Sequence, residues 1–433
     1  MKIGHARTEI TPPLGVPMGG YGSRGDKGAT AIESPLYADA CYIEQNDLRV
    51  VLITVDLVSV TESWSTPVRA EISKRLGIPT SHVLLAASHT HFGPATGEKA
   101  HDLHSGWLND LKLKLVDVAQ RAAAQTQDAT LSVGTGDFSR VAYNRRPVRA
   151  DGTCCTAYTL PPPEENLTFR AIDPKQTVLR FNTTNGQLAL ILVSTPMHAV
   201  VGGADFYAIS PDYPGVLRHA LEQVYQVPVM FAAGTAGNVV PFRRGEGCRQ
   251  LIGHYLAGVA LQSIEMATSG PGKLGFKQER LPVPSAVRKD PETMQAQVSA
   301  AELRLEKAET EKEKARLTDE LRRAKNLANL TAKLGPGDTL DIEVTAMSFG
   351  NLGVLCLPGE ILAETGLYIQ ARSPFPHTLV ISLVNQSMSY LATRSAIWEG
   401  GYESVATWYG EESEAFITEA AIRMLHEVWE CTR

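Results

Sequence analysis

The fold is decided by the stretch Val83-Leu84-Leu85-Ala86-Ala87, which runs directly into Ser88-His89-Thr90-His91. The first five residues are uncharged and rich in Val and Leu, which predicts a buried strand of a sheet. Because side chains alternate along a strand, we expect His89 and His91 to point the same way at its end. Strand ends in α/β sheets are where ligands usually bind. An isolated His-x-His pair is more often a pair of loop residues bonded to the backbone, so its meaning depends on the rest of the chain.

Predicted strands and helices alternate on both sides of this stretch. Strands are expected at 3–10, 40–43, 50–58, 131–135, 176–181, 187–195, 227–232, 340–349, 352–357 and 378–383. Helices are expected at 63–76, 107–125, 214–226, 250–267 and 412–429. Asn185-Gly186, between two of the strands, predicts a hairpin turn. The alternation predicts an α/β protein with one mixed central sheet flanked by helices on both faces.

The segment 291–334 differs from the rest of the chain because it is rich in Ala, Glu, Lys, Arg and Leu. Leu317, Leu321, Ala324 and Ala328 recur in it at helical spacing, which predicts one or two long amphipathic helices. We interpret the segment as a hairpin-like insertion on the surface of a single domain, 1–433. Two roles remain open for it, an arm that forms a homo-oligomer and a lid beside a pocket.

Composition excludes several classes of protein. The 433 residues are 43% hydrophobic and 20% charged, as is usual for a soluble globular protein. A net charge of −6 gives no basic surface for nucleic acid or for an anionic membrane. The chain has no apolar leader at its start and no run long enough to span a bilayer, so we expect a cytoplasmic protein. Its six scattered cysteines form no CxxC pattern, which favours reduced thiols.

Side chains that suit metal binding or catalysis recur near other predicted strand ends. His198 closely follows the strand 187–195, and Glu360 follows 352–357. Arg145, Tyr390 and Tyr402 lie in irregular or glycine-rich segments. Each has an ordinary structural explanation when it is taken alone. A histidine is often a satisfied core residue, a glutamate at a helix start is a favourable cap, and tyrosines are commonly half-buried.

Taken together and in this order, these residues resemble the catalytic domain of the neutral/alkaline ceramidases, a family of zinc-dependent amidohydrolases. The matching pieces are Ile10-Thr11-Pro12-Pro13-Leu14-Gly15-Val16-Pro17-Met18 with Gly20-Tyr21, Ser88-His89-Thr90-His91 with Gly93-Pro94, Asn144-Arg145 with Pro147, His198, Asp212-Tyr213-Pro214-Gly215, Pro358-Gly359-Glu360, and Tyr390 with Tyr402. They extend from about residue 3 to residue 405, so the resemblance covers nearly the whole chain.

The resemblance implies that His89, His198, Glu360 and Tyr390 bind a zinc ion. Imidazole nitrogen and carboxylate oxygen suit zinc, and a catalytic zinc site keeps a position open for water. The residue types therefore agree with the resemblance for three of the four, whereas tyrosinate is an uncommon ligand. Zinc in such a site lowers the pKa of water and polarises the amide carbonyl.

The resemblance also implies roles for three further residues. His91 is similar to the family's histidine that moves a proton or contacts the oxyanion. Arg145 and Tyr402 are similar to its donors to the carbonyl oxygen, where one preorganised donor is worth roughly 3–4 kcal/mol. Arg145 is preferred to Arg146 because it follows Asn144, as in the family motif.

Three departures from the family shape the expected substrate. Gly234-Thr235 replaces a Ser-Asn pair, Phe92 stands where the ceramidases have a serine, and the chain has no room for their C-terminal immunoglobulin-like domain. We therefore expect an amide-bond hydrolase that acts on a small soluble compound. The alternatives are an esterase or lactonase with the same zinc site, a true ceramidase, and a non-catalytic binding protein, which would be expected to have lost a ligand or the arginine.

Overall fold

The computed structural model describes residues 1–25, 27–96, 102–270 and 272–432. Its larger sheet has the strand order β11-β9-β8-β6-β1-β3-β4-β5, with β13 paired to β6. These strands are β1 (Lys2–Glu9), β3 (Tyr37–Gln45), β4 (Leu48–Val55), β5 (Val83–Ala87), β6 (Gln127–Asp137), β8 (Lys175–Thr183), β9 (Leu188–Thr195), β11 (Val229–Ala233) and β13 (Thr268–Ser269). The β4–β5 and β9–β11 pairs are parallel, and the other pairs in the sheet are antiparallel. The sheet is therefore mixed, as the sequence predicted, and β5 has the predicted bounds.

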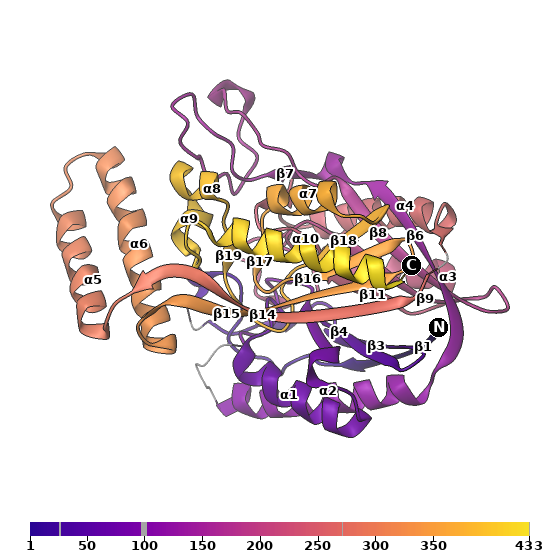
Figure 1. Cartoon of the computed structure of the whole chain (residues 1–433). Helices are drawn as coiled ribbons and strands as arrows, with labels where there is room; N and C mark the ends of the chain where they lie inside the picture. The colour runs from indigo at the N-terminus through magenta and orange to yellow at the C-terminus, as the bar shows by residue number, and fades with distance from the viewer. Residues whose placement is uncertain (26, 97–101, 271, 433) are drawn as a thin grey trace.

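Four helices cover one face of this sheet, and a second sheet covers the other (Figure 1). The helices are α1 (Glu62–Leu76), α2 (Asp102–Ala124), α3 (Tyr213–Tyr225) and α4 (Cys248–Glu265). The second sheet has the order β14-β15-β16-β18 and consists of β14 (Leu274–Arg288), β15 (Gly337–Phe349), β16 (Leu352–Cys356) and β18 (His377–Ile381). Helices α7 (Ala363–Arg372) and α10 (Ser413–Thr432) pack on its far side. The α/β class is thus confirmed. Helices were predicted on both faces of the central sheet, but on one face the second sheet packs directly against it, and α7 and α10 lie beyond that second sheet.

Strand β14 is the main element that the sequence did not predict. Charged residues such as Lys277, Glu279 and Arg280 interrupt its apolar pattern, and Pro282 and Pro284 argue against a strand. Both prolines are accommodated because β14 lies at the edge of its sheet, paired only with β15. An edge strand needs no backbone donor on its open side, so a proline there removes no ladder hydrogen bond.

The predicted insertion forms two helices between β14 and β15, namely α5 (Pro291–Glu306) and α6 (Glu311–Leu334). Asp290 and Thr310 cap them by accepting hydrogen bonds from backbone N–H groups. Figure 1 shows the pair projecting from one end of the molecule, with α6 on the side of α9 (Tyr402–Ala406). Asn326 Nδ2 on α6 donates to the Val405 carbonyl at 3.1 Å. Among the helices in the described part of the chain, none combines the length and apolar composition that a membrane crossing requires.

Short elements complete the structure around the ends of the sheets. They are β2 (Ala31–Ile32), β7 (Ala142–Asn144), β10 (Ala208–Ile209), β12 (Val239–Pro241), β17 (Glu360–Ile361), β19 (Tyr390–Leu391) and α8 (Arg394–Glu399), with single 3-10 turns at Gly22–Arg24, Thr80–His82, Ser139–Val141 and Pro163–Glu165. Although β5 and β11 are the two edges of the larger sheet in strand order, the sheet curls so that they lie beside each other. This curl brings the ends of β5 and β9 to one place.

A buried ion pair ties helix α3 to the larger sheet. Strand β4 ends at Val55, and Asp56 follows it instead of lying within the strand as the pattern 50–58 predicted. The carboxylate of Asp56 accepts from Arg218 Nη2 at 2.6 Å and from the Tyr37 backbone N–H at 2.9 Å. The side chains of Asp56 and Arg218 are almost fully buried, so each balances the charge of the other in the interior.

We expect Asp56→Ala to lower the free energy of unfolding by about 3 kcal/mol, because the buried Arg218 guanidinium loses its close partner and keeps only Asp39, 3.7 Å away. Urea denaturation followed by circular dichroism measures this loss. The matched control is Glu71→Ala, which removes an exposed i,i+4 ion pair with Arg75 and is expected to cost much less, because water screens this pair. Equal losses in the two variants would contradict the role assigned to the buried pair.

Candidate functional site

The two histidines after β5 converge, although not for the predicted reason. Strand β5 ends at Ala87, and His89 then adopts a left-handed backbone conformation with φ of 65°. Thr90 pairs with Ala199 in a parallel bridge, and its Oγ1 donates to the Ser210 carbonyl at 2.7 Å. The rings of His89 and His91 lie with their centroids 4.8 Å apart. A turn held by these contacts, and not the alternation of a strand, therefore brings the rings together.

His198 joins this pair from the segment after β9. Its ring centroid is 4.6 Å from that of His89 and 5.8 Å from that of His91. All three side chains are buried, and one nitrogen of each lies within 4.8 Å of the others. The described residues thus contain a cluster of three imidazoles at the place where β5 and β9 end.

Glu360 and Tyr390 reach the same place on two short paired strands. β17 and β19 are parallel, and Glu360 lies directly opposite Tyr390 in their register. The Oε2 atom of Glu360 is 3.2 Å from Nε2 of His89 and 3.0 Å from Nε2 of His198. The Tyr390 hydroxyl is hydrogen-bonded to Glu360 as well. The four residues that the resemblance gives as zinc ligands therefore lie together.

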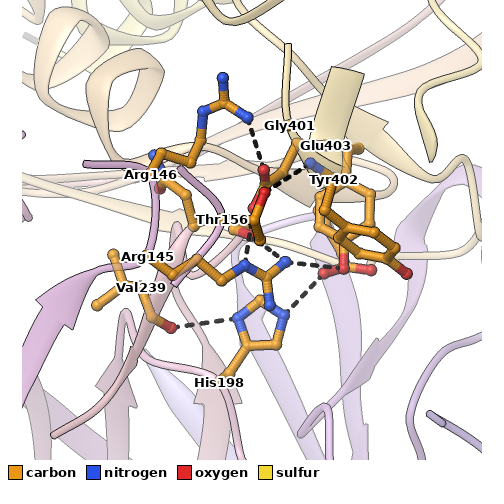
Figure 2. Close-up of polar contacts among 12 residues, drawn as sticks. Arg145, Arg146, Thr156, His198, Val239, Gly401, Tyr402 and Glu403 are labelled. Atoms are coloured by element: carbon orange, nitrogen blue, oxygen red, sulfur yellow. Dashed lines mark hydrogen bonds and ion pairs between the residues drawn. The ribbon is translucent and has the colours of Figure 1, made fainter. Parts of the chain in front are cut away.

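Backbone carbonyls fix the tautomers of two of these histidines. Nδ1 of His89 lies 2.7 Å from the Val58 carbonyl, and Nδ1 of His198 lies 2.6 Å from the Ala236 carbonyl. A carbonyl oxygen only accepts, so Nδ1 carries a proton in both rings, and in the neutral form of each ring Nε2 presents a lone pair. The Ala236 carbonyl comes from the glycine-rich turn 234–238, whose role in this structure is to orient His198 (Figure 2 draws the second such contact, to Val239).

The convergence of these atoms leaves an electrostatic gap that a cation fits. The lone pairs of two neutral imidazoles face one carboxylate oxygen, and neither His198 Nε2 nor Glu360 Oε2 has a hydrogen-bond partner. Acceptors held 3.0–3.2 Å apart without a proton between them repel one another. Neutral imidazoles oriented through Nδ1, together with a carboxylate, are also the donor set that zinc prefers. The residues present therefore fit a bound metal ion.

Burial keeps His91 and His198 neutral. Burial, with the nearby Arg145 guanidinium adding to it, lowers the pKa of His198 to about 4. Burial and the other two histidines likewise hold the pKa of His91 well below its usual value. Burial disfavours a charged carboxylate at Glu360, and positive charge beside it, whether on His89 and His198 or on a bound cation, holds its pKa well below the usual value. At neutral pH the cluster therefore offers free nitrogen lone pairs and an ionised carboxylate.

Arg145 and Tyr402, the two predicted donors, lie at the edge of this cluster. Arg145 Nη2 donates to the Tyr390 hydroxyl at 3.2 Å and to the Gly237 carbonyl at 3.0 Å. The rings of Tyr390 and Tyr402 meet edge to face with centroids 5.5 Å apart. The structure thus brings together all seven residues that sequence reasoning selected, from segments spread between residues 89 and 402.

Glu403 is a site residue that the sequence reasoning missed. Its carboxylate is fully buried and accepts from Arg145 Nε at 2.7 Å and from Arg146 Nη1 at 2.6 Å. Figure 2 shows it between the two guanidinium groups. The available signal was the pair Arg145-Arg146 itself, because two adjacent arginines in a buried segment require an acidic partner. Arg146 serves this pairing and also donates to the Gly400 carbonyl.

Two substitutions that distinguished the sequence from the ceramidases lie away from the cavity of the site. Phe92 is fully buried and packs against Tyr21 and Phe206. Thr235 is buried against Gly366, so closely that a Cβ added at Gly366 would meet the Thr235 side chain. Neither Phe92 nor Thr235 is among the residues that line the cavity. Gly20 of the first glycine-rich loop, in contrast, approaches His91 so closely that a Cβ would lie 2.5 Å from its ring.

Comparison with known proteins gives a consistent family. The sequence profile described as "Neutral/alkaline non-lysosomal ceramidase, N-terminal" matches residues 1–254, more than half of the chain. The chain is 28% identical over 258 residues to the neutral ceramidase of Pseudomonas aeruginosa and 23% identical over 228 residues to neutral ceramidase B of Dictyostelium discoideum. These matches span 55% and 48% of this chain, but only 37% and 31% of the relatives' own lengths.

Solved structures share the fold over almost the whole chain. The crystal structure of neutral ceramidase from Pseudomonas aeruginosa superposes with a TM-score of 0.73 at 22% identity, covering 98% of this chain and 74% of that one. A structure described as ceramidase complexed with C2 gives a TM-score of 0.74 at 19% identity, covering 99% and 75%. At this level of identity the likeness concerns the fold.

We expect Glu403→Gln to lower the free energy of unfolding of the metal-free protein by about 3–5 kcal/mol, because two buried guanidinium groups lose their shared charge partner. Chemical denaturation in the presence of a chelator measures the change. Glu399→Gln is the matched control, since Glu399 is a partly exposed acid that is paired with the half-exposed Arg170 and lies 3.7 Å from the same Arg146, and its loss is expected to be smaller, about 1 kcal/mol. A negligible effect of Glu403→Gln would show that the two arginines do not depend on this carboxylate.

Proposed function

This chain belongs to the neutral/alkaline non-lysosomal ceramidase family, and we propose that it is a zinc-dependent hydrolase that cleaves the C–N bond of an amide. In this reaction water adds OH to the carbonyl carbon and a proton to the departing amine. The observation that carries the proposal is the meeting of two imidazole lone pairs and one carboxylate oxygen, at 3.0 and 3.2 Å, in a buried site. In a neutral imidazole the single ring proton is held at Nδ1 by these carbonyl contacts, so no proton lies between the two lone pairs and the carboxylate oxygen.

We assign the metal to His89, His198 and Glu360, with Tyr390 as the fourth ligand. When zinc is bound, it supplies polarisation of the amide carbonyl and a water of lowered pKa. The Val58 and Ala236 carbonyls hold the two imidazoles in the required tautomer, and such oriented contacts typically strengthen metal binding. Tyr390 is set opposite Glu360 by the β17–β19 pairing, so the same short ladder positions both oxygen ligands.

Three residues act on the substrate in this proposal. His91 lines the cavity and is neutral, so its Nε2, which faces His89 at 3.4 Å, can hold the proton that passes to the leaving amine. Nε and Nη2 of Arg145 have fixed partners, which leaves Nη1 to donate to the carbonyl oxygen. The Tyr402 side chain lines the cavity beside it and supplies a second donor.

For the substrate we propose a small amide. Support comes from the cavity beside His91, which has a volume of about 740 Å³ and is in the range that encloses ligands of drug size. Ceramide, which the names of the relatives indicate for those proteins, is the second candidate. A panel of acyl amides, the corresponding esters and ceramide separates these substrates, and preferred cleavage of the esters would identify an esterase.

The insertion formed by α5 and α6 is proposed to be part of the pocket of a single domain, 1–433. Arg322 on α6 lines the same cavity as His91. Asn326 on α6 is bonded to the carbonyl of Val405 on α9, and α9 begins with Tyr402. The insertion is therefore well placed to influence the substrate and the position of a donor, as a lid or wall would.

We expect His89→Ala and His198→Ala to lose stoichiometric zinc and activity, because each removes a nitrogen ligand. Elemental analysis of dialysed protein, with turnover of the best amide, measures both. Tyr402→Phe is the matched variant that is expected to keep zinc and lower turnover. Metal and activity retained in His198→Ala would contradict the assignment, and loss of zinc in Tyr402→Phe would mean that the roles of the two tyrosines are exchanged.

We expect deletion of residues 291–333 to change substrate turnover and to leave the oligomeric state unchanged. The mass of the particle should fall only by the mass of the deleted segment in each chain. Light scattering and steady-state kinetics measure the two properties, and circular dichroism checks that the remainder is folded. A fall from a dimer to a monomer with unchanged turnover would instead identify the insertion as an oligomerisation arm.

A further inference from the structure

The cavity of the candidate site carries an unbalanced positive charge. The charged side chains among its lining residues are Arg145, Arg244 and Arg322, and no aspartate or glutamate of the described chain lines it. The charge of Arg145 is neutralised by its ion pair with Glu403, which does not line the cavity. Arg322 stands on the exposed surface of α6, 3.5 Å from Asp319. Arg244 is the cation that has no direct ion pair among the described residues, and the buried Asp212 carboxylate acts on it only at longer range.

Arg244 differs from the other buried arginines in having no partner. It follows β12 and is half-buried, and its Nε is inaccessible and without a hydrogen bond. No ion pair or hydrogen bond of its guanidinium occurs among the residues that the structure describes. Arg146 and Arg249, in contrast, are each paired with a glutamate. Burial and the charge of Arg145 lower the pKa of Arg244, and Tyr21, Tyr143 and Asp212 oppose this only in part.

A guanidinium withdrawn from water without a counter-ion is unfavourable unless a ligand satisfies it. Its planar fork matches carboxylate and phosphate oxygens through two parallel hydrogen bonds. Arg244 lines the same cavity as His91, Tyr390 and Tyr402, so a group bound to it belongs to a molecule whose other end can lie at the metal site. A neutral lipid amide offers no such group.

We infer that the physiological substrate is an acyl amide with an anionic group, a carboxylate or a phosphate, which is bound by Arg244 while the scissile amide lies beside the histidine cluster. This inference rests on the proposed amide hydrolysis and adds the chemical class of the substrate. Arg322 at the cavity adds a second, more exposed positive charge that attracts the same class of molecule. Tyr21 and Tyr158, which also line the cavity, provide apolar ring surface for the uncharged part.

Three substrates with one acyl chain test the inference, namely N-acylethanolamine, N-acylglycine and N-acylphosphoethanolamine. They present a neutral, a carboxylate and a phosphate group at similar distances from the amide. At least one anionic compound is expected to exceed the neutral one in kcat/KM by about tenfold or more, because a charge-assisted pair replaces an unpaired cation. The two anionic arms show which oxyanion the site takes.

Arg244→Gln is expected to reduce the ratio of anionic to neutral kcat/KM by about ten- to hundredfold. The control is Arg243→Gln, since Arg243 is the exposed neighbour whose guanidinium lies over the Phe242 ring at 5.2 Å, outside the cavity lining. This variant is expected to leave the ratio unchanged. Ceramide in a mixed micelle is included as the neutral lipid arm.

Two results would overturn the inference while leaving amide hydrolysis intact. One is a neutral amide or ceramide that is cleaved at least as well as both anionic compounds. The other is an Arg244→Gln variant in which the ratio does not change. If no amide is cleaved at all, the proposed function fails instead. The inference is then tested by calorimetric binding of non-hydrolysable analogues of the three compounds, in which a sulfonamide replaces the amide. The anionic analogues must then bind about tenfold more tightly to the original chain than to Arg244→Gln.

Discussion

The site depends on one electrostatic constraint, the crowding of two imidazole lone pairs against a carboxylate oxygen. His89 and His198 both donate a hydrogen bond from Nδ1–H to a backbone carbonyl, and both turn Nε2 toward Glu360. In a buried place such atoms repel one another unless a positive charge lies among them. A divalent cation satisfies all three at once. The surrounding structure holds this arrangement in place against its own repulsion.

The fold supplies that restraint from several layers. The curl of the larger sheet brings the ends of β5 and β9 together, and the β17–β19 pair delivers Glu360 beside Tyr390. A second buried charge system, Arg145 with Glu403 and Arg146, sets the guanidinium at the edge of the cluster. The metal ligands and the electrophilic donor are therefore held mainly by different contacts, and the hydrogen bond from Arg145 to the Tyr390 hydroxyl joins the two groups.

Local pattern was sufficient for most elements and for the choice of site residues. The apolar run 83–87, the hairpin turn Asn185-Gly186 and the amphipathic segment 291–334 each carry their own signal, and each forms the expected structure. The order of motifs along the chain identified side chains that no single motif could. What remained hidden depends on long-range contacts. Glu403 matters because it meets Arg145, 258 positions earlier.

Other differences have the same origin. Strand β14 contains prolines and charges that a strand tolerates only at an edge, and its edge position is a property of the assembled sheet. The turn at His89 is fixed by pairing with Ala199, a partner distant in sequence. Phe92 departs from the family at a position next to His91, yet its side chain packs into the core. Its position next to His91 in the sequence therefore did not predict whether its side chain faces the cavity or the core.

X-ray absorption at the zinc edge, combined with anomalous diffraction from crystals of the zinc-loaded protein, examines the constraint most directly. The account predicts one ion between His89, His198 and Glu360, with nitrogen ligands at about 2.0–2.1 Å and a carboxylate oxygen at about 2.0–2.2 Å. An ion bound by His89, His91 and His198 without Glu360, or an ion elsewhere in the chain, would contradict it.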